Sequence, residues 1–487
     1  MFKAAMAVTD IIRRFLPAKS FARHVMTIAG ATAFSQAISL AALPVLARLY
    51  PPGEYGTAAI YGSIVGLIVV VGSLRYEFAI PLPRTDGGAL HVALLALAIL
   101  VFIAVATGLV SPLLALWWEK EIGLSKWAFA LLVVVGVLTA GAYQVTNYWA
   151  VRKSKFGAIA RTRIQQGLAG PASQLALGFA GFGAIGLIVG QIVGQCAGLT
   201  RLALGMIADN RKPARTVHAR GLAWAARRYR RFPLYDSWAG LLNIAGAQAP
   251  VLLFAALFSP ILAGYYALAL RVLSAPLGLI GQAISQVLMP RIIEANRRGE
   301  AGELVLKLFR ILVNLSFFPF TIAAMLADQL VPFAFGPQWA PAGSIVAWTA
   351  LWVACQFVTS PLSVVITTLE AQRLHIGVQV ALFVLRICGI LLGAAMASPG
   401  LAVVGFTIAS ILGYTIYLLA IGFVSGVRAQ QFLQALIDPV LLSAFGAAAL
   451  YVVVPSFLAT SAALVILGGV WILRLNSVRL KMDAQTT

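Results

Sequence analysis

Apolar stretches long enough to cross a membrane recur along almost the whole chain, and only short polar breaks separate them. Because a helix needs about 20 apolar residues to span the hydrocarbon layer, this pattern predicts an all-α integral membrane protein with about fourteen transmembrane helices. Their predicted positions are near residues 25–47, 54–73, 88–115, 128–150, 158–180, 184–207, 234–258, 262–288, 308–333, 342–368, 374–397, 400–424, 432–454 and 457–474. The helix at 158–180 differs from the others because Arg161 and Arg163 lie near its start.

Composition agrees with this class of protein. The 487 residues are 61% hydrophobic and only 10% charged, and the mean hydropathy is +0.92, which excludes an ordinary soluble domain. Residues 1–24 lack the short apolar run and small-residue cleavage site of a secretory signal, so we predict a retained segment. Cys196, Cys355 and Cys388 fall inside predicted helices without metal-ligand spacing. We therefore predict neither a metal site nor a cofactor.

The distribution of positive charge predicts the orientation of the chain in the membrane. The formal net charge is +21, and if the amino terminus is cytoplasmic, all but five of the 36 Lys and Arg residues fall on the cytoplasmic side. We therefore predict that both termini are cytoplasmic. The charge is interpreted as a consequence of topology and of contact with anionic membrane lipids, and not as a nucleic-acid-binding surface.

Matching segments indicate that the chain contains two similar halves. Residues 44–46 and 250–252 both read Pro-Val-Leu, and each is followed by a proline-containing hairpin and a glycine, Gly56 or Gly264, that opens the next helix. Repeated lobes are typical of transporters that expose a central site to each side in turn. The predicted division is an N-terminal cytoplasmic segment at 1–24, a six-helix lobe at 25–208, a basic cytoplasmic linker at 209–232, a second six-helix lobe at 233–426, and two additional helices with a cytoplasmic tail at 427–487.

Two blocks within residues 30–83 carry a resemblance to a known family. They read "LPVLARLYPPGEYG" and "LRYEFAIPLP". With the fourteen-helix count, they resemble the amino-terminal signature of the polysaccharide flippases that handle O-antigen and capsule, within the multidrug/oligosaccharidyl-lipid/polysaccharide exporter superfamily. The detailed resemblance is confined to this N-terminal region, and the rest of the chain is similar mainly in helix pattern.

The resemblance implies a fold and an activity. The implied fold is the two-lobe bundle of drug exporters and lipid II flippases. The implied activity is movement of an undecaprenyl-diphosphate-linked oligosaccharide, such as an O-antigen, capsule or exopolysaccharide repeat unit, from the cytoplasmic to the outer leaflet of the bacterial inner membrane. The implied partners are this glycan lipid and the polymerase or export machinery for the polysaccharide. The glycan itself does not follow from the resemblance.

Arginines are the candidate ligands for the diphosphate of such a substrate, because a guanidinium binds phosphate oxygens well. Arg271 and Arg386 lie inside predicted helices, where facing lipid would cost each about 2.5 to 3.5 kcal/mol, so both are expected to face the protein interior. Arg48 and Arg75 lie at opposite ends of the first two helices. We hypothesise that Arg271, Arg75 and Arg48 contact the diphosphate in succession, with Arg386 either joining them or pairing inside the second lobe. The alternative for Arg48 and Arg75 is that they extend to the membrane surfaces.

The block around Arg75 and Glu77 is a candidate inner gate. If Pro81 and Pro83 keep the chain extended here, the two side chains point the same way and form an ion pair that weakens the grip on phosphate. The alternative is an ordinary helix end in the headgroup layer. For a carboxylate that couples transport to a cation, Asp236 is the better candidate and Asp438 the weaker one, and the alternative for both is an ordinary helix-end position. No Walker loop occurs, so we expect no ATP hydrolysis.

Two other function classes remain open on the sequence alone. A cation-coupled antiporter for drugs or other small molecules, from the same superfamily, is expected to carry acidic residues in its cavity, whereas the most deeply placed charges here are arginines. A membrane-embedded glycosyltransferase or polymerase usually has acidic catalytic residues or a long loop on the outer side. Here the longest extramembrane segment is predicted to be cytoplasmic and basic. The flippase, a transporter and not an enzyme, is the favoured interpretation.

Overall fold

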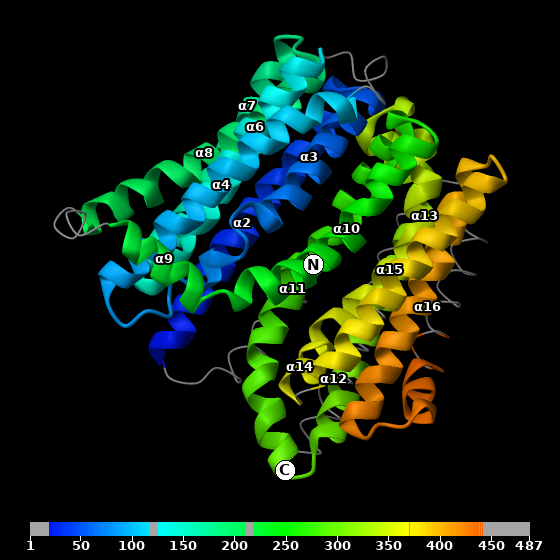
Figure 1. Cartoon of the computed structure of the whole chain (residues 1–487). Coiled ribbons are helices and arrows are strands. Elements are labelled where there is room, and N and C mark those ends of the chain that lie inside the picture. Colours follow the sequence, from blue (N-terminus) through cyan, green and yellow to red (C-terminus); the bar gives the residue numbers. More distant parts are fainter. Residues whose placement is uncertain are drawn as a thin grey trace.

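The computed structural model describes residues 19–115, 125–210, 218–369, 371–437, 439 and 441. Every regular element within these residues is a helix, so the predicted all-α class is confirmed. Figure 1 shows two groups of long helices that approach each other at the top of the view and diverge below. The chain therefore has the two-lobe architecture that its internal repeat predicts.

The first lobe is built from six long helices. They are α2 (Lys19–Leu49), α3 (Pro52–Gly72), α4 (Asp86–Ala115), α6 (Lys126–Arg152), α7 (Phe156–Phe179) and α8 (Gly183–Asp209), with a short 3-10 helix η1 (Tyr76–Ala79) after α3. Each coincides with one of the first six predicted spans to within a few residues. An exception in length is α2, which begins well before residue 25. The hydrophobic pattern locates these helices because each one needs an apolar stretch long enough to cross the membrane.

The second half begins with the short helix α9 (Ala219–Arg228) and the π-helical turn η3 (Phe232–Asp236). The remaining elements are α10 (Ser237–Leu257), α11 (Pro260–Arg297), α12 (Ala301–Phe335), η4 (Pro337–Trp339), α13 (Ala340–Leu362), α14 (Val364–Thr368), α15 (Gln372–Ala395) and α16 (Pro399–Ser425). They cover the next six predicted spans. The last two predicted spans, 432–454 and 457–474, lie almost wholly outside the described residues.

Ten of the described helical segments are long and apolar enough to cross a membrane. Helix α7 is not among them, although it packs between α2 and α8 like a spanning helix. Its arginines Arg161 and Arg163 lower the apolar character of its first turns. The sequence pattern nevertheless located it, because the apolar stretch after these arginines is still helical.

Equivalent helix pairs in the two lobes pack through glycines. In the first lobe, Gly190 of α8 lies against Gln174 of α7, and in the second lobe Gly405 of α16 lies against Gly389 of α15. Small residues let helix backbones approach closely, which is the main way that helices associate tightly in a membrane. Gly190 and Gly405 thus have the same packing role in the two lobes.

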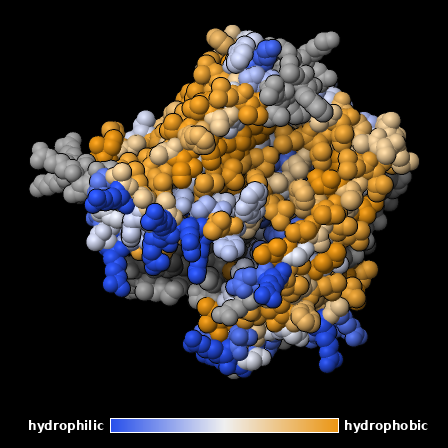
Figure 2. Space-filling view, in the orientation of Figure 1, coloured by the Kyte–Doolittle hydropathy of each residue, from blue (hydrophilic) through white to orange (hydrophobic). Residues whose placement is uncertain are grey.

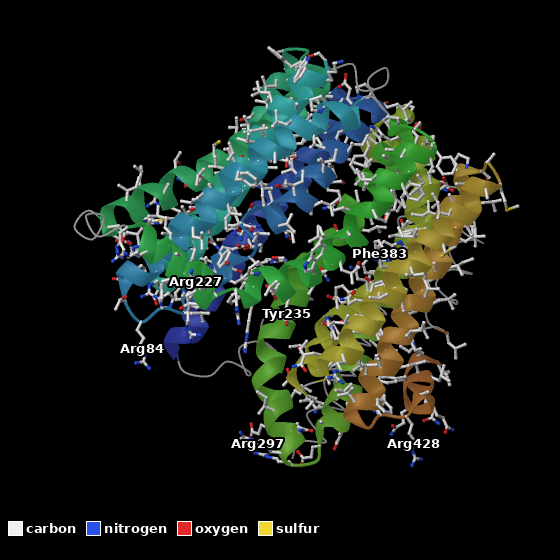
Figure 3. All side chains as sticks on the ribbon, viewed as in Figure 1. Arg84, Arg227, Tyr235, Arg297, Phe383 and Arg428 are labelled. Carbon is white, nitrogen blue, oxygen red and sulfur yellow. The ribbon has the colours of Figure 1, made fainter. Side chains whose placement is uncertain are left out.

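Charged residues collect at one end of the bundle. In Figure 3, Arg84 and Arg227 lie toward the lower left end of the first lobe, and Arg297 and Arg428 lie at the lower end of the second. We call this the basic end, and the opposite end, where the two lobes meet, the far end. Figure 2 shows hydrophobic surface on the flanks of both lobes and hydrophilic residues between and below them toward the basic end. Such a distribution suits a protein that exposes its flanks to lipid and its basic end to water.

Candidate functional site

The two lobes touch backbone to backbone at the far end, through the pair of glycines that the internal repeat relates. A Cβ on Gly56 of α3 would overlap the carbonyl oxygen of Pro260, and a Cβ on Gly264 of α11 would overlap that of Pro52. The two contacts are reciprocal, as an approximate two-fold relation between the lobes requires. Both positions therefore need glycine for close approach of the two helix starts.

Hydrogen bonds fasten the lobes beside these glycines. The Ala47 carbonyl lies in the last turn of α2, where helix carbonyls lack partners within the helix. It accepts hydrogen bonds from Nε1 of Trp339 at 2.7 Å and Nε2 of Gln338 at 3.2 Å. In return, Arg48 donates to the Phe333 carbonyl of α12 at 3.1 Å. We call these five residues the far-end clasp.

Arg48 is thus placed at the outer edge of the interface between the lobes. Its side chain is exposed, and it donates a hydrogen bond to Phe333 of the second lobe. The sequence did not point to Trp339, although this residue is fully buried and its ring meets those of Tyr55 and Tyr265 edge to face, with centroids 5.2 and 5.9 Å away. A signal was present in the Gly-Pro-Gln-Trp run at 336–339, because an indole near a helix end needs an acceptor when it is buried.

Arg271 lies on α11, the helix that packs along α3 of the other lobe. Its side chain is exposed, and it has no hydrogen bond or ion pair with another described residue. It interacts electrostatically with the hydroxyl of Tyr55, which is buried and also lacks a hydrogen-bond partner in the described part of the chain. A free guanidinium on the helix at the lobe boundary is available to an anion.

Arg386 occupies the second of the two positions considered for it, inside the second lobe. Its side chain is buried, and its Nε donates to the Ser410 hydroxyl at 3.0 Å while Nη2 lies 3.3 Å from the Tyr414 hydroxyl. Its guanidinium carbon also lies 5.0 Å from the ring centroid of Trp352 and 5.5 Å from that of Phe406. Aromatic rings and neutral oxygen acceptors, not an acid, stabilise this cation.

The third hydrogen bond of Arg386 has a specific cause in the sequence. Its Nη1 donates to the Gly246 carbonyl of α10 at 3.3 Å. Pro250 lies four residues after Gly246 in the same helix, and because proline has no N–H, it leaves this carbonyl without its helical partner. Arg386 therefore replaces the missing helical donor and holds α15 to α10, which itself packs against α3 of the first lobe. This is a structural role at the lobe boundary, so we do not place Arg386 in the substrate path.

Helix α10 also contacts the first lobe through polar side chains. The Ser63 hydroxyl of α3 donates to the Gln248 side chain at 3.1 Å. Tyr235, just before α10, lies in the space between the lobes toward the basic end, and Phe383 lies on the side of α15 that faces α10 (Figure 3), 3.8 Å from the place of a Cβ on Gly246. Helix α10 thus carries contacts to both lobes.

Arg75 lies where α3 ends, near the basic end. Leu74 and Arg75 have positive φ angles of 48° and 62° and reverse the chain into η1. The guanidinium carbon of Arg75 lies 4.9 Å from the ring centroid of Phe78. The guanidinium also covers Gly240 of α10 so closely that a Cβ there would overlap it. The extended chain expected between Arg75 and Glu77 is wrong, because left-handed residues and a 3-10 turn occupy this stretch.

Glu77 is fully buried beside this turn. The Ser73 hydroxyl donates to its Oε2, whereas its Oε1 has no hydrogen-bond partner among the residues that the structure describes. Burial raises the pKa of Glu77 above its usual range, against the lowering effects of the Ser73 hydrogen bond and of Arg75. The described ion pairs are Arg152 and Lys153 with Asp86, Lys155 with Asp209, and Arg298 with Glu294. Arg75 and Glu77 interact through space but form no such direct pair.

Asp236 is exposed and ends the π-helical turn η3, which contacts η1. Its charge acts on Glu77 and raises the pKa of that carboxyl. The structure therefore brings Arg75, Glu77 and Asp236 together at one joint between the first lobe and α10. Within the described residues, no group of three or more His, Cys, Asp or Glu side chains forms a metal site.

Arg152 fixes the proline segment that follows η1, a role that the sequence did not suggest. Its Nη1 donates to the carbonyls of Ile80, Pro81 and Pro83 at 3.4, 3.2 and 2.6 Å. It also pairs with Asp86 at the start of α4. Four acceptors around one guanidinium hold the joint against α6.

Comparison with known proteins places the fold. The lipid II flippase MurJ, in an inward closed conformation, superposes with a TM-score of 0.70 at 13% identity, over 94% of this chain and 99% of that one. An inward-facing multidrug resistance MATE transporter gives 0.54 at 12% identity, over 82% and 95%. A MATE transporter of Vibrio cholerae gives 0.51 at 13% identity, over 88% and 100%. At these identities the similarity shows a shared fold.

The family assignment rests on the sequence itself. No protein with a curated function is significantly similar to the chain in sequence. The model of the polysaccharide biosynthesis protein family, however, matches residues 45–344, which include the far-end clasp, Arg271 and the Arg75 joint. Because this match spans well over half of the chain, the protein belongs to the polysaccharide biosynthesis protein family.

Proposed function

We propose that the protein moves an undecaprenyl-diphosphate-linked oligosaccharide, an O-antigen, capsule or exopolysaccharide repeat unit, from the cytoplasmic to the outer leaflet of the bacterial inner membrane. The basic end is the cytoplasmic end in this proposal, and both termini lie there. The lobes alternate between closure at the far end and closure at the basic end. The family match, the shared fold with a lipid II flippase and the charges at the lobe boundary support it.

The observation that carries the proposal is the free guanidinium of Arg271 on the helix that faces the other lobe. A diphosphate offers oxygens that an arginine binds with charge-assisted hydrogen bonds. Arg75, half-buried at the basic end of the same interface, is the first contact, and Arg271 is the second. Arg48 at the far end is the last contact, once the clasp has opened and freed it from Phe333. Arg386 supports α10 and does not contact the substrate.

The membrane potential supplies a driving force for this direction. Moving one charge across the membrane changes the free energy by about 2.3 kcal/mol per 100 mV. A diphosphate that leaves a negative cytoplasm therefore moves downhill. No ATP-binding loop is needed for such export.

A reconstituted assay tests the proposal. The protein is placed in liposomes with a fluorescent undecaprenyl-diphosphate oligosaccharide, and a membrane-impermeant reductant reports the fraction that has crossed to the outer leaflet. We expect Arg271→Gln to slow crossing about 10- to 100-fold, since a hydrogen bond to a charged group contributes about 1.5 to 3 kcal/mol. Arg298→Gln is the matched control at the end of the same helix, because Arg298 directly follows α11, is exposed at the basic end and pairs with Glu294.

The assay also defines the outcome that would reject the proposal. If wild-type protein does not accelerate crossing, or if Arg271→Gln crosses at the wild-type rate, the assigned substrate or path is wrong. In cells, deletion of the gene should leave lipid-linked glycan facing the cytoplasm with its synthesis intact. Loss of synthesis would instead indicate a glycosyltransferase or polymerase.

The likeness to MATE transporters supports a second candidate, a cation-coupled antiporter for drugs or other small molecules. The same liposomes distinguish it. An antiporter would take up cationic dyes in exchange for protons or sodium ions that move down their gradient. It would leave the glycan lipid in place. The exposed Asp236 would then be the coupling carboxylate, and Asp236→Asn would abolish dye uptake.

A further inference from the structure

The joint between the first lobe and α10 contains two unpaired buried groups of complementary chemistry. Within the described part of the chain, Nε of Arg75 is a buried donor without an acceptor, and Oε1 of Glu77 is a buried acceptor without a donor. The two residues are separated only by Tyr76 in one tight turn. A buried polar group without a partner costs about 1 to 3 kcal/mol. Both costs would disappear if the two groups met.

The observed arrangement is the one expected for a protonated Glu77. A neutral carboxyl does not attract the guanidinium strongly, and Arg75 lies instead against Phe78 and over Gly240 of α10. The Ser73 hydroxyl contacts only the other carboxyl oxygen of Glu77. A fully buried carboxylate without a direct cation is unfavourable, which is why such groups take up a proton.

The charged and titratable groups around Glu77 come from each element packed against η1. Asp236 of η3 and Tyr148 of α6 interact electrostatically with it, together with Arg75. Arg152 of α6 is held by backbone carbonyls and Asp86. Nδ1 of His91 in α4 lies 2.7 Å from the Gly87 carbonyl oxygen. Among the described residues, Arg75 is the cation placed to pair with Glu77.

We propose that Glu77 is a proton-binding site that controls the contact between the first lobe and α10. With the proton bound, Arg75 remains on Gly240 and keeps the joint closed. When the proton leaves to water, the carboxylate draws the guanidinium to Oε1, Arg75 leaves Gly240, and the joint loosens. The ion pair between Arg75 and Glu77 thus belongs to the deprotonated state, and this inference holds whichever substrate the protein carries.

Proton binding is tested by difference infrared spectroscopy of the full-length protein in lipid nanodiscs, titrated from about pH 5 to about pH 9, a range that covers ordinary and buried glutamates. We expect a carboxylic acid C=O band that disappears as pH rises and is missing in Glu77→Gln. Glu303→Gln is the control because Glu303 is an exposed acid at the start of α12. If Glu77→Gln retains the band, the proposed site is wrong.

Movement of the joint is tested by distances between spin labels at Arg84 and Arg297, which lie at the basic end of different lobes (Figure 3), after replacement of the three cysteines. The wild-type distances should change with the infrared band. In Arg75→Gln the band should persist and the distances should no longer respond. Constant wild-type distances over the whole titration, or an unchanged response in Arg75→Gln, would overturn the proposed control.

A further variant keeps the test valid if Glu77→Gln fails to fold. Asp236→Asn removes a negative charge on the protein surface near Glu77 and should lower the midpoint of the titration by about one pH unit, because like charges favour the protonated form. Arg75→Gln should move the midpoint upward for the opposite reason. A midpoint that stays at its wild-type value in both variants contradicts the assignment.

Discussion

The proposed role of Arg386 as a replacement donor makes a quantitative prediction about Pro250. Arg386→Met removes all three hydrogen bonds and leaves the Gly246 carbonyl unpaired. Pro250→Ala gives residue 250 an N–H, which can restore the helical hydrogen bond to Gly246. In the Pro250→Ala background, Arg386→Met should therefore cost less than it does in the wild type.

The size of this difference follows from one hydrogen bond. The contact of Arg386 with Gly246 is 3.3 Å long, at the weak end of the range for an N–H donor. An unpaired buried carbonyl costs about 1 to 3 kcal/mol, and we therefore expect a coupling free energy of about 1 to 2 kcal/mol. The single cost of Arg386→Met is less informative, since removing a buried cation also relieves its desolvation, which offsets the lost hydrogen bonds.

A double-mutant cycle measures the coupling free energy directly. The wild type, both single variants and the double variant are unfolded in detergent, and the free energies of unfolding are compared. Pro319→Ala with Arg386→Met is the matched control, because Pro319 interrupts a different helix, α12. Its cycle should be additive to within about 0.5 kcal/mol. If the Pro250 cycle is equally additive, Arg386 does not compensate for the proline.

Three further predictions test other contacts at the lobe boundary. Gly264→Ala should lower the free energy of unfolding by about 1 to 3 kcal/mol, measured by thermal unfolding, because the added Cβ has no space. Gly377→Ala is the control at an open helical position, and it should be neutral or stabilising in the same assay. Trp339→Phe keeps an aromatic ring but removes the indole N–H and its 2.7 Å bond to Ala47, and should lower the free energy of unfolding by at least about 1 kcal/mol; an unchanged melting temperature would refute the clasp. Arg152→Gln should speed deuterium uptake by the backbone amides of residues 82–88, about tenfold for each 1.4 kcal/mol by which the local opening free energy falls. Uptake at the wild-type rate would show that Arg152 does not fix the segment.

The sequence predicted the helices of this protein because the membrane imposes a length and a composition on each of them. Even α7 was located, although Arg161 and Arg163 interrupt its apolar pattern. The internal repeat also pointed to residues that are in contact. Gly56 and Gly264 occupy equivalent places in the two lobes, and each packs against the first turn of the helix that contains the other.

The candidate site was predictable only in part. The sequence indicated that Arg386 must avoid lipid, but its partners come from α10, α13 and α16, and no local pattern places those helices around it. Pro250 was a usable signal, because an interior proline always leaves one carbonyl to be satisfied. The conformation around Arg75 was missed since its positive φ angle depends on the packing of η1 against α4 and α6, while Pro81 and Pro83 alone favoured an extended chain.

The proposed alternation of the lobes requires the far-end clasp to open. The far-end clasp contains three hydrogen bonds, from Trp339, Gln338 and Arg48, and such bonds contribute on average about 0.6 kcal/mol each within membrane proteins. Its polar part is thus worth about 2 kcal/mol, or roughly a thirtyfold shift in population. A ligand that binds the alternative state only thirtyfold more tightly can offset this part of the barrier. Under this proposal, the clasp would bias the lobes toward closure at the far end without locking them there.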